Sequence, residues 1–248
     1  MRVLISNDDG IDSRGIFELA RAFKEIAEVT VVAPLREQSA VGHAITIQHP
    51  LRVIEFSKKE NFFGHAVDGT PADCVKMGVR NIMDAPPDVV VSGINHGSNT
   101  AINVIYSGTV SAAREAASMD FPAVAVSITS RVAKHLDVAA HFAVVAVQKL
   151  AEMGFPKGVL LNVNVPDLPL EEIKGVVYTR MGDSKWDDVY EKRQDPTQRD
   201  YYWLTGKLVE LDTNLDYDHY ATTNNYVSIT PLRIDQTDHD LLSQLKKQ

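Results

Sequence analysis

Short apolar runs rich in β-branched residues recur along the first half of the chain, and helix-like segments lie between them. The runs are RVLIS (2–6), VTVVA (29–33), DVVVS (88–92) and AVAVS (123–127). They do not alternate between apolar and polar residues, so each strand is predicted to be buried on both faces. A parallel sheet covered by helices on both sides satisfies that requirement. We therefore expect an α/β fold with a mostly parallel sheet.

Helix and strand patterns continue along the rest of the chain. Helices are predicted at 13–27, 70–83, 109–118, 134–153 and 238–247. Further strands are predicted at 51–56, 63–67, 159–165, 175–180, 201–210 and 226–231. Residues 35–50 and 93–108 are predicted to be loops, and the second is rich in Gly, Asn and Ser. Long loops of that kind are usually functional.

The polar stretch 182–200 lies between two of the predicted strands and places aromatic residues among charged ones. Such a segment makes a poor core, so we expect a hairpin-like arm at about 180–212 that protrudes and serves as an interface. The chain has no internal repeat and no low-complexity linker, so residues 1–248 are predicted to form a single α/β domain. Within it, residues 1–130 are expected to form the core with the active site, and residues 131–248 to complete it.

The charge balance limits the partners of the chain. It has 25 Lys and Arg against 33 Asp and Glu, a net charge of −8, and no basic cluster, so long nucleic acids are excluded as partners. No run approaches the ~18 apolar residues of a membrane helix. Asp8 and Asp9 interrupt any signal-peptide core, and the single cysteine, Cys74, excludes an internal disulfide. We expect a cytoplasmic protein that does not bind a membrane.

Side chains with oxygen donors follow three of the predicted strands. They are Asp8 and Asp9 after the first strand, Ser39 after the second, and Asn95 after the strand at 88–92. Because ligands of open α/β sheets bind at the carboxyl ends of parallel strands, these residues are predicted to meet in one site. Carboxylate, hydroxyl and amide oxygens suit Mg²⁺, Mn²⁺ or Ca²⁺ better than zinc.

Each of these residues also has a purely structural interpretation. An Asp-Asp-Gly sequence after a strand is typical of a turn, and Ser39 and Asn95 taken alone are typical loop residues. Two adjacent carboxylates without a nearby lysine are nevertheless costly unless a cation or a proton resolves their repulsion. The aspartate pair therefore favours the metal site.

Ser107, Gly108 and Thr109 open a predicted helix at the end of the Gly-rich loop. Ordinary N-capping by Ser107 or Thr109 explains them on their own, yet the free N–H groups at a helix start also bind phosphate. Because the loop runs directly from Asn95, a metal site and a phosphate site would share one cleft. This combination predicts phosphoester hydrolysis, in which a metal polarises the phosphoryl oxygens and activates water.

Other site signatures are missing, since the sequence has no GxGxxG, GxxxxGK[ST], HExxH or GxSxG motif. Two alternative functions stay open. In an aspartyl-phosphate phosphatase Asp8 would be the nucleophile, although that class usually separates its aspartates by one residue. A nucleotide-binding regulatory module would bind a monophosphate without releasing phosphate. His96, in the Gly-rich loop, is a further candidate for substrate contact.

Several motifs in fixed order resemble the survival protein SurE family of metal-dependent nucleotide phosphatases. They are RVLISNDDGIDSRGI, QSA, VDGTPADCV, VSGINHGSN, YSGTVSAAREA and YVSITPL, which together span residues 2–232. The resemblance implies a three-layer Rossmann-like core and 5′-nucleotidase activity, often also on 3′-monophosphates, with short polyphosphate as a further substrate. It also implies one divalent cation per subunit, Mg²⁺ or Mn²⁺, in a site that Ca²⁺ is able to occupy.

The resemblance also assigns roles to residues. The family holds its metal with an aspartate pair, a serine and an asparagine, and the matching residues are Asp8, Asp9, Ser39 and Asn95. The residues expected to bind the substrate phosphate are Asn95, Ser107, Gly108 and Thr109. One of the two aspartates is expected to accept the proton of the attacking water, and the sequence does not choose between them. C-terminal segments that exchange between subunits imply a homodimer or homotetramer, which would explain the aromatic stretch 182–210.

The chain departs from the family pattern at a few positions, none of which is a predicted ligand. Alanine replaces the usual glycine at Ala40, Ala101 and Ala116, and Asn103 replaces the usual aspartate. Ala40 is expected to adopt a backbone conformation open to a residue with a Cβ atom. Asn103 removes a negative charge near the mouth of the cleft, so substrate preference is expected to differ while the reaction is retained.

Overall fold

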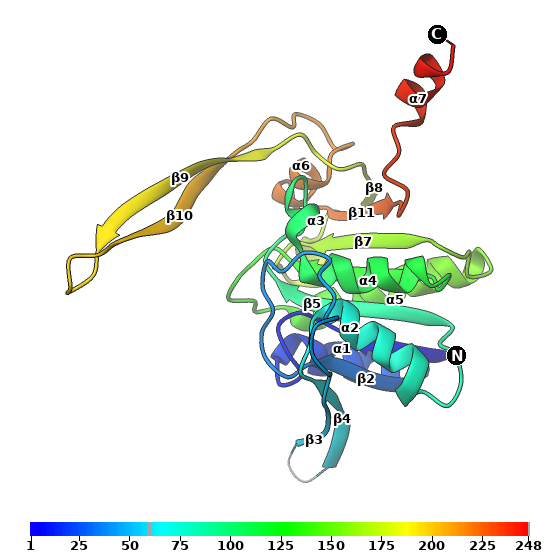
Figure 1. The fold of residues 1–248 in the computed structure, drawn as a ribbon. Coiled ribbons are helices and arrows are strands. Elements are labelled where there is room, and N and C mark those ends of the chain that lie inside the picture. Colours follow the sequence, from blue (N-terminus) through cyan, green and yellow to red (C-terminus); the bar gives the residue numbers. More distant parts are fainter. Residues whose placement is uncertain (59–60, 248) are drawn as a thin grey trace.

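A mixed β-sheet forms the middle layer of the molecule (Figure 1), whose computed structural model describes residues 1–58 and 61–247. Within these residues the sheet has nine strands in the order β3-β4-β2-β1-β5-β6-β7-β11-β8. Its strands are β1 (Arg2–Ser6), β2 (Glu28–Pro34), β3 (Val53–Lys58), β4 (Asn61–Val67), β5 (Val89–His96), β6 (Ala123–Ile128), β7 (Leu160–Val165), β8 (Val176–Tyr178) and β11 (Val227–Leu232). Neighbours from β4 to β7 run parallel, whereas β3 and β11 run antiparallel to β4 and β7. The predicted α/β class is confirmed.

Helices cover both faces of this sheet. The pair on one face is α1 (Arg14–Lys24) and α5 (Leu136–Glu152), and the pair on the other is α2 (Pro71–Met77) and α4 (Gly108–Ser118). In β1, Val3 and Ile5 join the core on the α1 side, while Leu4 joins the core on the α4 side. Because both faces of the central strands are buried, their sequences are apolar without alternation.

Side-chain caps begin α2 and α4 close to where the sequence predicts these two helices. Thr70 and Asp73 form a capping box at the start of α2, with a proline as the first helical residue. At α4, Ser107 Oγ accepts the N–H of Val110 at 3.0 Å. Ser107 rather than Thr109 is therefore the N-cap, and Thr109 lies inside the first turn.

The strand predicted at 88–92 is longer than predicted. After a register shift beyond Ser92, Asn95 and His96 pair with residues of β6, so β5 continues to His96. The same predicted loop contains a short helix, α3 (Asn103–Tyr106). The prediction that residues 93–108 form only a loop is wrong, because pairing with a neighbouring strand overrides the weak strand propensity of a Gly- and Asn-rich sequence.

An antiparallel hairpin, β9 (Lys185–Gln194) and β10 (Asp200–Val209), projects away from the sheet and its helices (Figure 1). The C-terminal hairpin expected from the sequence is confirmed. The prediction that residues 182–200 are a polar connection between two strands is wrong, because they contain β9. The strand β8 pairs instead with β11 in the central sheet. Both faces of the hairpin are exposed, so burial leaves no apolar pattern that marks β9.

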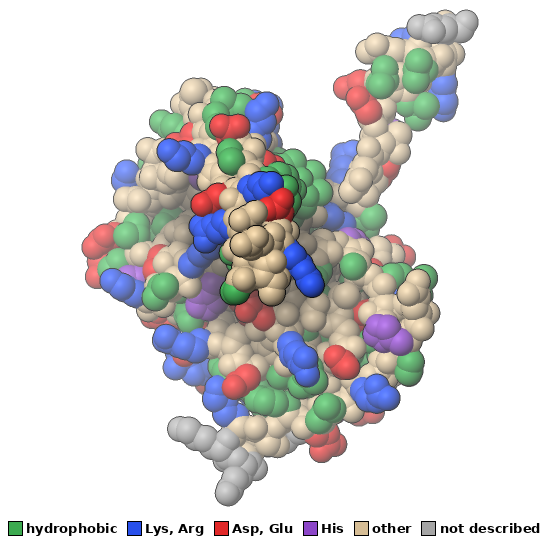
Figure 2. All heavy atoms as spheres, turned by 60° about the vertical axis from the view of Figure 1, so that its left-hand side comes forward, with side chains coloured by type: hydrophobic (Ala, Val, Ile, Leu, Met, Phe, Trp, Pro, Cys, Tyr) green, Lys and Arg blue, Asp and Glu red, His purple; other side chains and the backbone are tan. Residues whose placement is uncertain are grey.

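Two more helices follow the hairpin. The helix α6 (Asp218–Thr223) packs beside β11, and its six residues are too few for a helical periodicity to be seen in the sequence. The helix α7 (His239–Leu245) stands apart from the body, as the segment that projects at the upper right of Figure 2. Its Leu241 and Leu245 are exposed. In the described part of the chain, no helix combines the length and apolar character that crossing a bilayer requires.

Candidate active site

The turn after β1 is shaped by Asn7, which is fully buried. Its side-chain amide donates to the Gly10 carbonyl oxygen at 2.9 Å and to Ser13 Oγ at 2.7 Å, and its Oδ1 accepts the Gly10 N–H at 3.2 Å. Gly10 has a φ of +95°, a conformation that residues with a Cβ atom rarely adopt. This turn therefore holds Asp8 and Asp9 in a defined position at the carboxyl end of β1.

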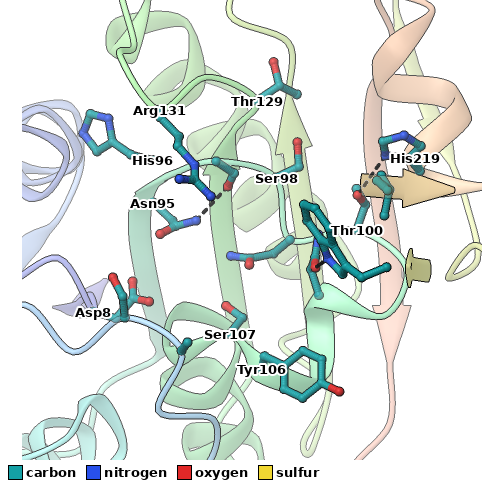
Figure 3. Close-up of a pocket in the computed structure, with 17 residues that line it drawn as sticks. Asp8, Asn95, His96, Ser98, Thr100, Tyr106, Ser107, Thr129, Arg131 and His219 are labelled. Atoms are coloured by element: carbon teal, nitrogen blue, oxygen red, sulfur yellow. Dashed lines mark hydrogen bonds between the residues drawn. The ribbon is translucent and has the colours of Figure 1, made fainter. Parts of the chain in front are cut away.

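A pocket of about 400 Å³ lies at this end of the sheet, and its volume is within the range of small-molecule sites. The predicted site residues that line it are Asp8, Ser39, Asn95 and Ser107. Figure 3 shows three of them, which come from the end of β1, from β5 and from the start of α4. The remaining predicted residues, Asp9, Gly108 and Thr109, follow lining residues in sequence without lining the pocket themselves.

The two aspartates are costly to ionise in the folded chain. Burial raises the pKa of Asp8 to about 6; a hydrogen bond from Thr109 opposes this rise and the charge of Asp9 adds to it. Burial likewise raises the pKa of Asp9 to about 6, with a further rise from the charge of Glu37. Among the described residues, the buried Oδ2 of Asp9 has no hydrogen-bond partner. A bound cation would offset the repulsion between the carboxylates and would give this oxygen atom a partner.

The neutral members of the predicted metal set also present oxygen atoms. Ser39 donates its hydroxyl proton to Glu37 Oε1 at 2.5 Å, and Asn95 donates its side-chain N–H to the Gly97 carbonyl oxygen at 2.7 Å. Each side chain thus donates a hydrogen bond to a protein oxygen, and lone pairs of its own oxygen atom remain to bind a ligand. Oxygen-only donors fit a hard divalent cation. His96, the residue after Asn95, also lines the pocket.

The first turn of α4 packs directly against Asp8. Thr109 is fully buried and donates its hydroxyl proton to Asp8 Oδ1. Gly108 comes so close that a Cβ atom at this position would lie 2.7 Å from Asp8 Cβ. Ser107 lines the pocket while its Oγ caps the helix. The start of α4 therefore positions Asp8 and also brings the amino end of a helix to the pocket.

A few hydrogen bonds hold the loop between β2 and β3 where Ser39 lines the pocket. Gln38 N–H donates to the carbonyl oxygen of Asp8 at 2.8 Å, and Gly42 N–H donates to that of Tyr106 at 3.1 Å. Between these anchors Ala40 has a φ of +56°. The expectation for Ala40 is therefore wrong, because the anchored loop imposes a left-handed conformation that costs a residue with a Cβ atom about 1–2 kcal/mol.

A buried glutamate on α4 fastens the same loop to the body. Glu115 accepts hydrogen bonds from His43 Nε2 at 2.8 Å and from Lys76 Nζ on α2. Burial alone would raise the pKa of Glu115, but the hydrogen bonds and charges of His43 and Lys76 outweigh it and lower the pKa to about 2. The network joins the loop to α2 and α4 on one side of the pocket.

Replacing Glu115 with glutamine is expected to destabilise the protein by about 2–3 kcal/mol at pH 7. The pKa is lowered by folding, so this contribution is present above the unfolded pKa near 4.5 and is lost as the pH falls towards 2. Urea unfolding of both proteins from pH 7 to pH 3 measures it. The exposed Glu152→Gln, which loses only a surface pair with Lys149, is the control. A difference that does not shrink in acid would contradict the assignment.

The pocket also has lining residues that the sequence analysis did not single out. Thr129 and Arg131 follow β6, and Arg131 places a positive charge at the pocket (Figure 3). Their position just after the predicted strand 123–127 is the sequence signal that marks them, as it marks Asp8 and Asn95 after their strands. Trp186 and Leu208 come from the hairpin and His219 from α6, and no local sequence signal places these three at the site.

Most of the chain matches one known protein family. The family model described as "Survival protein SurE" matches residues 3–188. The chain belongs to the SurE family. The SurE match includes every residue predicted for the site, from Asp8 to Thr109, and the resemblance inferred from the motifs is confirmed.

Individual SurE proteins are similar over the full length. A protein of Syntrophobacter fumaroxidans named 5′-nucleotidase SurE is 48% identical over 247 residues, covering 100% of this chain and 99% of its own. One of Chlorobaculum tepidum with the same name is 43% identical, covering 98% and 93%. The crystal structure of the SurE protein from Aquifex aeolicus superimposes with a TM-score of 0.86 at 38% identity, covering 100% and 99%.

Proposed function

We propose that the chain is a phosphomonoesterase that hydrolyses nucleoside 5′-monophosphates to nucleoside and phosphate, with 3′-monophosphates and short polyphosphate as further substrates. Relatives named 5′-nucleotidase SurE, similar from end to end, support the reaction. The observation that carries it is that Asp8, Ser39, Asn95 and Ser107 line the same pocket, where oxygen donors meet the amino end of a helix.

One divalent cation is proposed as cofactor, held by Asp8, Asp9, Ser39 and Asn95. Mg²⁺ and Mn²⁺ are the proposed ions, and Ca²⁺ is able to occupy such an oxygen site. When bound, the cation polarises the phosphoryl oxygens and makes water a better nucleophile. The partnerless Oδ2 of Asp9 and the raised pKa values of both aspartates support this fit.

The chain's own residues are proposed to bind and orient the phosphate. The amide of Asn95 and the hydroxyl of Ser107 contact phosphate oxygens, and the N–H groups of Gly108 and Thr109 add the positive end of the α4 dipole. The hydroxyl of Thr109 acts by holding Asp8. A carboxylate oxygen of Asp8 or of Asp9 accepts the proton of the attacking water.

The test is phosphate release from nucleoside 5′- and 3′-monophosphates, short polyphosphate and a chromogenic phosphate ester. Each is assayed with EDTA and then with Mg²⁺ or Mn²⁺ added back. We expect chelation to abolish release and the metal to restore it. Activity indifferent to chelation would contradict the cation, and saturable monophosphate binding without release would identify a regulatory module. A trapped phosphoryl group on Asp8, found by mass spectrometry, would identify the aspartyl-phosphate route.

We also propose that the chain forms a homodimer or homotetramer by exchange of its C-terminal segments. An isolated two-stranded hairpin is only marginally stable in water. The hairpin nevertheless exposes large side chains, among them Tyr190, Trp203 and Leu204, each more than half exposed. A second copy of the chain that covers these residues and the apolar side of α7 would explain why the hairpin and α7 both expose apolar side chains.

A cytoplasmic location is proposed on the composition of the chain. Its single cysteine, Cys74, is buried and free, and burial raises the pKa of its thiol. A buried thiol of this kind is an inert packing residue.

A further inference from the structure

The base of the hairpin forms part of the pocket wall. Trp186 on β9 and Leu208 on β10 are direct cross-strand partners, and both line the pocket. Tyr106, at the end of α3, lines it as well. One part of the wall is therefore built from two aromatic rings and a leucine, although the carboxylate of Asp8 and the hydroxyl of Ser107 line the same pocket.

The tryptophan is held in place yet left open. Its indole Nε1 donates to Asn103 Oδ1 at 2.7 Å, which fixes the ring against α3. Even so, 40% of Trp186 and 56% of Tyr106 remain exposed. Large aromatic surface that is oriented and uncovered at a pocket is typical of a ligand contact, because stacking a flat ring there loses little conformational entropy.

The chemistry of the pocket matches the two ends of one molecule. Asp8, Asn95 and Ser107 provide the environment proposed above for a phosphate and its cation. In Figure 3 the side chains of Asp8 and Tyr106 lie on different sides of Ser107, and all three residues line the same pocket as Trp186. A nucleoside monophosphate has a phosphate at one end and a flat aromatic base at the other.

We propose that the nucleobase of the substrate stacks on the wall formed by Trp186, Leu208 and Tyr106, with Trp186 as the main contact. The proposal rests on the proposed function and adds a residue that determines specificity for nucleotides over simpler phosphate esters. Stacking on an aromatic side chain is worth about 1–3 kcal/mol per base and accepts every base. The hydrolysis of purine monophosphates and that of pyrimidine monophosphates are therefore both expected to depend on Trp186.

The kinetic test compares adenosine 5′-monophosphate with ribose 5-phosphate, which lacks the base. Trp186→Ala is expected to lower kcat/KM for the nucleotide by about 5- to 150-fold, mainly through KM, and to leave ribose 5-phosphate within about twofold. Tyr178→Ala, which removes an exposed aromatic ring from β8 away from the pocket and the hairpin, is the control and should change neither. Equal losses on both substrates would overturn the proposal, since they would indicate a purely structural role.

Fluorescence gives a readout that needs no turnover. Trp186 and Trp203 are the only tryptophans in the sequence, so Trp203→Phe leaves Trp186 as the sole reporter. Adenosine 5′-monophosphate should quench it saturably, and ribose 5-phosphate at equal occupancy should not. Quenching without phosphate release would uphold the base wall while the proposed reaction fails. Phosphate release from the nucleotide with no change in fluorescence would overturn the base wall while the reaction stands.

Discussion

Replacing Asp8 with asparagine is expected to lower kcat by about a thousandfold or more, because the proposed cation loses a charged ligand that contributes several kcal/mol in the transition state. The variant should also bind Mg²⁺ or Mn²⁺ much more weakly, as measured by calorimetric titration. Ser39→Ala, which removes a neutral ligand from the same pocket, should weaken metal binding less. Equal losses in the two variants would contradict this ligand set.

The same substitution is expected to stabilise the metal-free protein. Folding raises the pKa of Asp8 to about 6, so its ionised form costs the folded state about 3 kcal/mol at pH 7. Asparagine avoids that cost, and the melting temperature should rise by about 6–12 °C at pH 7.5 in EDTA. As the pH falls through 6 towards 3, the carboxyl becomes protonated first in the folded and then in the unfolded state, and below about pH 3 the gain should vanish. An inactive variant that is more stable separates lost chemistry from lost folding.

The centre of the candidate site is predictable from the sequence because it depends on only two local patterns. Unalternating apolar runs identify parallel strands, and the polar residues after them then lie at one edge of the sheet. Asp8, Ser39 and Asn95 line one pocket for this reason. Arg131 obeys the same rule at the end of β6, so the sequence contained the information needed to find it.

The rest of the site depends on contacts between distant segments. Trp186 reaches the pocket because β9 pairs with β10 and its indole bonds to Asn103, and the sequence near residue 186 encodes neither contact. Ala40 adopts a left-handed backbone because bonds to other segments anchor the loop on either side of it. Local propensity favours the opposite conformation, so tertiary contacts decide at both positions.

The second large effect is expected at Gly108, which the sequence suggested only as a phosphate contact. Alanine there would place a Cβ atom 2.7 Å from Asp8 Cβ and 2.9 Å from its Oδ2. Neither neighbour is the end of a long flexible chain, so Asp8 has to move or α4 has to shift. A displacement of about 1 Å at a reacting group can cost a hundredfold in rate, and we expect a loss of that size in kcat for Gly108→Ala.

Gly78→Ala is the matched control. Its Cβ atom would lie 2.9 Å from Leu4 Cδ1, a similarly close contact that lies within the core and away from the pocket. Both variants strain the fold, because each new Cβ atom would lie under 3.0 Å from a neighbouring side chain. Only Gly108→Ala should lose kcat and metal affinity, while Gly78→Ala should lose stability alone. Near-normal turnover in Gly108→Ala would mean that the distance between α4 and Asp8 does not set the geometry of the reaction. The tight approach of the helix would then serve packing, and the role proposed for the start of α4 would fall with it.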